Sequence, residues 1–341
     1  MINVSFLSIL LIVELTSFST LDAQYISQEN DEKIYLIVDK NGNGDYTSIQ
    51  EAIDNAFEET TIYIKPGVYS EIISIRKKVN LIGEDKENVI INPISEENKY
   101  AVRLGAPGIS ISYLCITNGA PGIYSTGIYI SLSNINIKNC NFYNNPIGIA
   151  IWTSNNSIEN CSFWGCTDEG IALLGSKYSN CENNKIINCK FYDNCDGIEL
   201  QYSSNNIIAN CEFYNNTHSG IDAISSNNDN NLITGCKIYN NRVHGIYLSS
   251  SSENQIIDCS IENNKDGNII ITKNSNNNVI NECIQNDDLE EDNLVIDIPS
   301  DNNILNGYNN LELNRKKVIE QIYNIVSNLK ILKIINYFTN F

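Results

Sequence analysis

Both histidines of this 341-residue chain, His218 and His244, precede a glycine that recurs in an internal repeat, and the preceding copies of the repeat carry acidic residues at this place. An imidazole exchanges protons near neutral pH, and paired carboxylates can act as general acid and base in the cleavage of a glycosidic bond. We therefore interpret this group as a candidate catalytic site, with these members: Asp196, Glu199, His218, Asp222 and His244. The alternative is that these are solvated turn residues of a repetitive protein, with no chemical role.

Two further sets of side chains accompany this group. Carboxylates that precede it could hold a cation, and calcium is the ion that such oxygen ligands favour. The candidate ligands are Asp168, Glu169 and Asp193, and no other cofactor is indicated. Candidate substrate-binding residues are Tyr143, Trp164, Tyr192, Tyr214, Tyr239, Arg242 and Tyr247. The first five recur once per repeat, where they could pack against sugar rings or stack on one another to stabilise strands.

The elements that must position these residues are internal repeats. The strings NCNFYNN (139–145), NCKFYDN (188–194) and NCEFYNN (210–216) are near copies, and a cysteine returns every 21 to 28 residues. A period of this length is typical of a solenoid. Short runs of alternating apolar and polar residues predict strands, and no helical stripe interrupts residues 100 to 300. The fold class predicted is therefore all-β: a single-stranded right-handed parallel β-helix over residues 34–310.

The recurring cysteines behave as small buried residues in this interpretation. Their irregular spacing fits neither a zinc site nor a compact disulfide framework, so we expect free thiols. Cys166 and Cys195, in turns of consecutive units, are the best candidates for a pair if any disulfide forms. The recurring members are Cys140, Cys161, Cys189, Cys211, Cys236, Cys259 and Cys283.

Each open end of a solenoid needs a cap. The segment DYTSIQEAIDNA (45–56) predicts a short N-terminal capping helix, with Thr47 to Gln50 as its capping box. Residues 311–341 carry an apolar stripe with helical spacing among basic residues. We expect a C-terminal helix there that covers the last coil, or binds a partner, a membrane surface or a second copy. The stripe consists of Val318, Ile322, Ile325, Leu329 and Leu332.

The ends and the net charge bear on location and partners. Residues 1–23 contain the apolar run FLSILLIV (6–13), typical of a signal peptide. This predicts a secreted, periplasmic or cell-surface protein without a membrane span in the mature chain. The formal charge of −19 argues against nucleic acid as a partner.

At this level the chain resembles known families. The stretch VDKNGNGDYTSIQEAIDNA followed by TIYIKPGVYSEIISIRKKVNLIGE (38–84) resembles the N-terminal segment of pectin methylesterases. The later units resemble the β-helix repeats of carbohydrate-binding proteins, sugar hydrolases and the NosD-type copper-binding family. The esterase motifs Gln-Asp-Thr and Asp-Phe-x-Phe-Gly and the epimerase motif Asp-Pro-His are absent, so the resemblance implies the fold and not an activity.

Several functions remain open. One is a polysaccharide-binding protein that also cleaves or modifies its ligand, as a lyase, glycoside hydrolase or epimerase. Another is a non-catalytic surface or envelope protein that serves as a scaffold or adhesin. A third is a periplasmic metal-binding protein. A polysaccharide or cell-surface glycan is the partner we expect.

Overall fold

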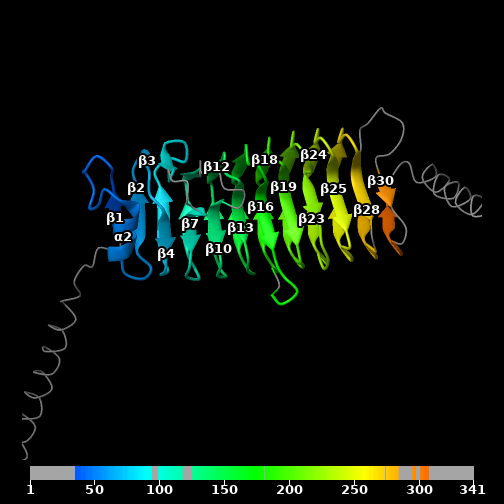
Figure 1. Ribbon diagram of the computed structural model, residues 1–341, viewed down its shortest axis with the longest axis horizontal. Helices are drawn as coiled ribbons and strands as arrows, with labels where there is room; N and C mark the ends of the chain where they lie inside the picture. Colours follow the sequence, from blue (N-terminus) through cyan, green and yellow to red (C-terminus); the bar gives the residue numbers. More distant parts are fainter. Residues whose placement is uncertain are drawn as a thin grey trace, which may run out of the picture.

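The computed structural model describes residues 35–93, 99–117, 125–179, 181–272, 274–283, 294–296 and 300–306. Short strands are stacked turn upon turn along one axis, with the helix α2 at the N-terminal end (Figure 1). The predicted signal peptide and C-terminal helix lie outside the described residues. Within the part that is described, no helix is long and apolar enough to cross a membrane.

The strands form three parallel sheets that run the length of the coil. The first, sheet A, has 12 strands, and neighbours pair in register from one turn to the next. Its strands in order are β1 (Tyr35–Val38), β2 (Thr61–Ile64), β5 (Asn80–Gly83), β8 (Ser110–Ser112), β11 (Asn136–Lys138), β14 (Ser157–Glu159), β17 (Lys185–Ile187), β20 (Ile207–Ala209), β23 (Leu232–Thr234), β26 (Gln255–Ile257), β29 (Val279–Asn281) and β31 (Ile304–Asn306).

Sheet B follows sheet A in each turn and has nine described strands. They are β3 (Gly67–Tyr69), β6 (Val89–Ile91), β9 (Cys115–Ile116), β12 (Asn141–Tyr143), β15 (Ser162–Trp164), β18 (Lys190–Tyr192), β21 (Glu212–Tyr214), β24 (Lys237–Tyr239) and β27 (Ser260–Glu262). Sheet B carries the recurring Phe-aromatic pairs, one residue pointing inward and the next outward.

Sheet C completes each turn and has ten described strands. They are β4 (Ile73–Ile75), β7 (Tyr100–Leu104), β10 (Thr126–Ile130), β13 (Ile147–Ile151), β16 (Glu169–Leu174), β19 (Asp196–Gln201), β22 (Ile221–Ala223), β25 (His244–Ser249), β28 (Gly267–Thr272) and β30 (Leu294–Ile296). Apart from β22, the strands of sheet C are longer than those of sheet B over the central turns, so sheet C is the broader sheet.

The core repeats because each turn packs on a copy of itself. The inward Phe142 and Phe163 stack at 4.7 Å between ring centroids, and Phe191 and Phe213 continue the stack at 4.8 Å per step. The recurring cysteines are buried beside them and are free thiols, as predicted, and the other four cysteines are free as well. Cys195 donates its backbone N–H to the carbonyl oxygen of Cys166 on the preceding turn, without a disulfide.

Asparagine columns hold the turns together. The side-chain amide of Asn194 donates to Asn216, which donates to Asn241 in the next turn, over 3.2 and 2.9 Å. Many other turn asparagines, Asn188 and Asn210 among them, have positive φ, the left-handed conformation that Asn tolerates. The abundance of asparagine therefore has a structural cause, because these turns demand both a left-handed backbone and a hydrogen-bonding amide.

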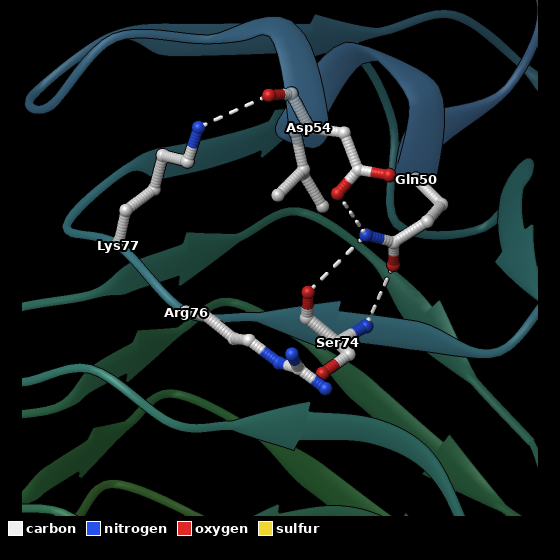
Figure 2. A pocket seen from close by; sticks show the side chains of 6 residues that line it. Gln50, Asp54, Ser74, Arg76 and Lys77 are labelled. Carbon is white, nitrogen blue, oxygen red and sulfur yellow. Dashed lines mark hydrogen bonds between the residues drawn. The ribbon is translucent and has the colours of Figure 1, made fainter.

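The N-terminal cap is the helix α2 (Ile49–Asn55), which buries its apolar face as predicted. The predicted capping box is off by one residue. Ser48 is the N-cap, and its hydroxyl accepts from Glu51 N–H, while the Glu71 carboxylate, 22 positions away, accepts from the Ile49 N–H. Gln50 does not cap the helix. Its side-chain amide donates to the carboxylate of Asp54 and to the carbonyl oxygen of Ser74, and its amide oxygen accepts from the Ser74 N–H (Figure 2).

Candidate functional site

The candidate catalytic residues gather on the outward face of sheet C. In one row across the strands Glu169 pairs with Asp196, and in a second row Glu199 pairs with Asp222. These four side chains point away from the core yet are only 4 to 9% exposed. Neighbouring turns lie about 4.8 Å apart, so each side chain is covered by those of the turns on either side. The repeat thus concentrates carboxylates that lie 23 to 30 residues apart in sequence.

His218 lies over two of these carboxylates. Its Nδ1 atom is 2.8 Å from Asp196 Oδ1 and 3.4 Å from Asp222 Oδ2. The backbone N–H of Ser219 also donates to Asp196 Oδ1, over 2.7 Å, which fixes that carboxylate. The His218 side chain itself is 41% exposed. Its Nδ1 edge is therefore engaged with buried acids while the remaining part of the imidazole can reach a ligand.

Glu169 and Glu199 lie on the adjacent strands β16 and β19, and we call them the carboxylate pair. Burial, together with the charge of Glu199, raises the pKa of Glu169 far above its usual range, so this carboxyl is protonated at neutral pH. Its Oε2 atom is buried and has no hydrogen-bond partner among the described residues. Burial also raises the pKa of Glu199, which accepts a hydrogen bond from Gln201. The pair can share a proton, as acid–base carboxylates in enzymes do.

Asp222 and Asp196 have elevated pKa values as well. Burial and the charge of Asp196 raise the pKa of Asp222 to about 7, although His218 acts in the opposite direction. Burial raises the pKa of Asp196, against the same opposing effect of His218. Asp222 Oδ1 has no hydrogen-bond partner within the described part of the chain. Raised pKa values and unsatisfied acceptors are costly to a fold, and they are common where a protein binds or reacts.

His244 lies at the C-terminal end of this group of side chains. Its ring centroid lies 6.2 Å from that of His218, and it stacks on Tyr247 at 5.0 Å. Burial lowers the pKa of His244, and the neighbouring His218 lowers it further. Its Nδ1 atom is buried with no partner among the described side chains and backbone. We name these six residues the carboxylate–histidine cluster: Glu169, Asp196, Glu199, His218, Asp222 and His244.

The chain was compared with known proteins. A family model described as a right-handed β-helix region matches residues 79–221, and one described as the periplasmic copper-binding protein NosD matches residues 175–328. The Arabidopsis thaliana protein named Probable pectinesterase 56 is 31% identical over 103 residues, which is 26% of this chain and 36% of that protein. A second pectinesterase from the same plant is matched over 27% of its length, so the chain spans about a third of these relatives or less.

Solved structures agree on the architecture. PfbA, a surface adhesin of Streptococcus pneumoniae, superposes with a TM-score of 0.59 at 17% identity, over 76% of this chain and 87% of that one. A PL6 alginate lyase bound to a trisaccharide gives 0.57 at 14% identity, over 76% and 62%. The Dettilon tailspike protein gives 0.57 at 13% identity, over 68% and 49%.

The protein is a right-handed parallel β-helix with the pectin-lyase-like fold. That fold resembles those of proteins that act on polysaccharides and of NosD, which is consistent with the sequence-based resemblance. At these identities the similarity establishes the architecture, and the chemistry must be argued from the side chains of this β-helix.

The structure brings together all five predicted catalytic residues, but it groups a different set of metal ligands. The atoms within 4.8 Å of one another belong to Asp196, His218 and Asp222. Of the residues predicted as ligands, Asp193 is exposed in a left-handed turn, and Glu169 belongs to the carboxylate pair. The sequence signal that could have assigned Glu169 to the cluster is its place directly before Gly170, which matches Asp196 before Gly197.

The five predicted sugar-binding aromatics form a closed ladder on sheet B. Trp164 stacks between Tyr143 at 5.4 Å and Tyr192 at 5.7 Å, with ring planes 16° and 4° apart. Tyr214 and Tyr239 extend the same stack. We call these five residues the aromatic ladder. Its ring faces are occupied by neighbouring rings, so it presents mainly edges and hydroxyl groups to solvent. Arg242 is exposed, and Tyr247 lies against His244.

The donor atoms can be tested against the metals that the family resemblance suggests. Copper(I) favours thiolates and thioethers, but burial raises the pKa of thiols such as Cys140 and Cys161, and the sequence has one methionine. Calcium takes roughly six to eight oxygen ligands. One imidazole nitrogen with two carboxylates, and the free Oδ1 of Asp222, fits a divalent transition-metal ion better than either.

Proposed function

We propose that this β-helix binds a polysaccharide across the outward face of sheet C and hydrolyses it at the carboxylate–histidine cluster. The observation that supports this proposal most directly is the position of the His218 side chain. Its Nδ1 lies 2.8 Å from Asp196 and 3.4 Å from Asp222. A carboxylate at Nδ1 orients an imidazole and leaves its Nε2 to exchange a proton with substrate, as in other acid–base sites.

The roles follow from where these side chains lie. A protonated His218 donates from Nε2 to the glycosidic oxygen that leaves. A carboxylate of the Glu199–Asp222 row accepts the proton of a water molecule that attacks the sugar carbon. The pKa of Asp222 near 7 lets this group serve as a base above neutral pH. Hydrolysis is favoured over elimination because a protein of charge −19 repels the dense polyanions from which a lyase abstracts protons.

An extracytoplasmic location is part of the proposal. It rests on the signal-peptide-like residues 1–23 and on the similarity to a periplasmic family. A glycan outside the cytoplasm is the matching substrate class. The terminal segments stay as predicted from sequence: residues 1–23 as the signal peptide and 311–341 as a cap or an interaction segment.

The test is release of reducing ends from a panel of neutral and weakly acidic polysaccharides. General acid–base catalysis contributes roughly 10²- to 10⁴-fold, so Asp222→Asn and His218→Asn should each lower kcat by at least about 100-fold. Asp193→Asn is the matched control, because Asp193 is an exposed acid in a neighbouring turn. Hydrolysis that survives Asp222→Asn and His218→Asn would refute the catalytic role. If a glycan binds but no reducing ends are released, the protein binds glycans without hydrolysing them.

Divalent-cation binding is a second candidate function, favoured by the three converging ligand atoms and the free Asp222 Oδ1. Titration calorimetry with manganese, zinc, copper(II) and calcium, after chelator treatment, would measure it directly. We expect one equivalent of a transition metal to bind the wild type and not Asp222→Asn. Equal heats for the two proteins would rule out this site.

A further inference from the structure

A second group of aromatic side chains lies on sheet C, on the face that carries the carboxylate–histidine cluster. Tyr100 on β7, Tyr129 on β10 and Trp152 directly after β13 follow one another on successive turns. We call them the aromatic trio. Their ring centroids are 6.2 and 6.4 Å apart, with planes inclined at 35° and 37°. Trp152 is 45% exposed.

This geometry differs from that of the aromatic ladder. There the rings are parallel to within 16° and their centroids are closer together. All three side chains of the trio are at least partly exposed. Exposing an indole to water is unfavourable, so the half-exposed Trp152 is suited to be covered by a ligand.

Small apolar residues connect the trio to the cluster. In the row that contains Tyr129, the next turns supply Ala150 and Ala172 before Glu199. Ile147, Ala150 and Ala172 form a small buried cluster of their own, separate from the main core, with Leu174 packed against it. Three strand spacings, about 14 Å, separate Tyr129 from Glu199, a distance that a few sugar rings of an extended chain can span.

A cation lies on the other side of the trio. Arg103 pairs in register with Tyr129 and is exposed. It makes no hydrogen bond or ion pair with the residues that the structure describes. An unpaired guanidinium next to partly exposed aromatic rings suits a sugar that bears a carboxylate, since Arg binds carboxylates through two parallel N–H donors. The face therefore runs from a basic end past the aromatic trio to an acidic end.

We propose that Tyr129, Trp152 and Arg103 form a binding subsite for an acidic sugar, about three strand spacings from the cluster, and that the glycan continues from there as neutral sugar towards the cluster. The ligand class is thus a glycan of low charge density that carries a uronic acid at the Arg103 end. This inference rests on the proposed function for its direction along the coil, whereas binding at the subsite does not require that the cluster be catalytic.

The experiment is a glycan array probed with the full chain, containing neutral xylo-oligosaccharides and the same oligosaccharides with a glucuronic acid branch among other uronate-bearing glycans. Affinities for the glycans bound are then measured by calorimetry. We expect uronate-bearing glycans to bind more tightly than their neutral counterparts. Trp152→Ala should weaken binding at least about 10-fold, and Arg103→Gln should remove the preference for the acidic form.

Trp164→Ala is the matched control, because it removes the same side chain from the aromatic ladder and should leave affinity unchanged. Trp152→Ala must also lower the melting temperature less than Trp164→Ala does, because a merely structural residue would show the reverse order. The subsite is refuted if no glycan binds, or if Trp152→Ala and Trp164→Ala bind alike. Failure of the proposed hydrolysis has a different signature: Asp222→Asn binds and turns over like wild type, while Trp152→Ala has still lost affinity.

Discussion

Sheets B and C both carry aromatic and acidic side chains on their outward faces, but these side chains find partners on sheet B to a greater extent than on sheet C. On sheet B the aromatic rings stack on one another, and the acid Glu212 accepts from Tyr239 and pairs with Lys190. On sheet C the aromatic planes of the trio are tilted, and the buried acids Glu169 and Asp222 each keep one oxygen that no residue in the described part of the chain hydrogen-bonds. The difference indicates that sheet B stabilises the coil, while sheet C forgoes stability at positions suited to a ligand.

The largest expected effect is on the pH dependence of stability. Asp222 has a pKa of about 7 in the folded protein against an ordinary value of 3.8. Between these values the folded state holds a proton that the unfolded state releases, so the free energy of unfolding falls as pH rises from about 4 to 8. The loss from this one group is about 4 kcal/mol at most. The raised pKa values of Glu199 and Asp196 act in the same direction.

Urea denaturation at pH 4.5, 6 and 8 in the presence of a chelator measures how the free energy of unfolding depends on pH. Asp222→Asn should match the wild type at pH 4.5 and exceed it by about 2–4 kcal/mol at pH 8. Asp193→Asn, in an exposed turn, should follow the wild type throughout. A wild-type stability that is flat or rises across this range, with Asp222→Asn following it, would contradict the strain assigned to sheet C.

The two tryptophans provide the next test of the comparison. Trp164→Ala removes two stacking contacts from the aromatic ladder, each worth about 0.5–1.5 kcal/mol, and should lower the free energy of unfolding by about 1–3 kcal/mol. Trp152→Ala, from the half-exposed trio, should cost less than about 1 kcal/mol. Thermal or urea unfolding of both variants at one pH shows which substitution lowers the free energy of unfolding more. A larger loss for Trp152→Ala would mean that the trio is a structural element.

The sequence predicted the fold well because the core is periodic: the stacked Phe142 and Phe163 occupy the same place in consecutive units. It also located the catalytic candidates, since one turn of the coil is one repeat. Finer assignments depended on contacts between distant residues. The N-cap is Ser48 and not Thr47 because Glu71, from a separate strand, fixes the start of the helix.

Ring orientation was beyond the reach of the pattern. Alternation placed Trp164 on the outside of the coil, but whether its face meets solvent or another ring depends on side-chain torsions. The trio was missed for a different reason. Tyr100 and Tyr129 lie before the first cysteine-marked unit, so nothing aligned them with Trp152. The stabilising ladder and the candidate subsite therefore differ in the neighbours that their residues have in space, and not in their place within the repeat.

The smallest expected effect concerns the polar edge of sheet B. The Tyr239 hydroxyl donates to Glu212 Oε1 over 2.9 Å, and Lys190 lies 3.0 Å from the other oxygen of that carboxylate. Burial and the Glu212 carboxylate raise the pKa of Tyr239 to about 12, so the hydroxyl remains a donor at any physiological pH. Tyr239→Phe keeps the stack and removes only this bond. We expect a loss of about 0.5–1 kcal/mol, since partly exposed bonds are worth little, and no change in glycan affinity. A loss of affinity in Tyr239→Phe, measured on the same array, would place the ligand on sheet B and overturn the division of roles between the two sheets.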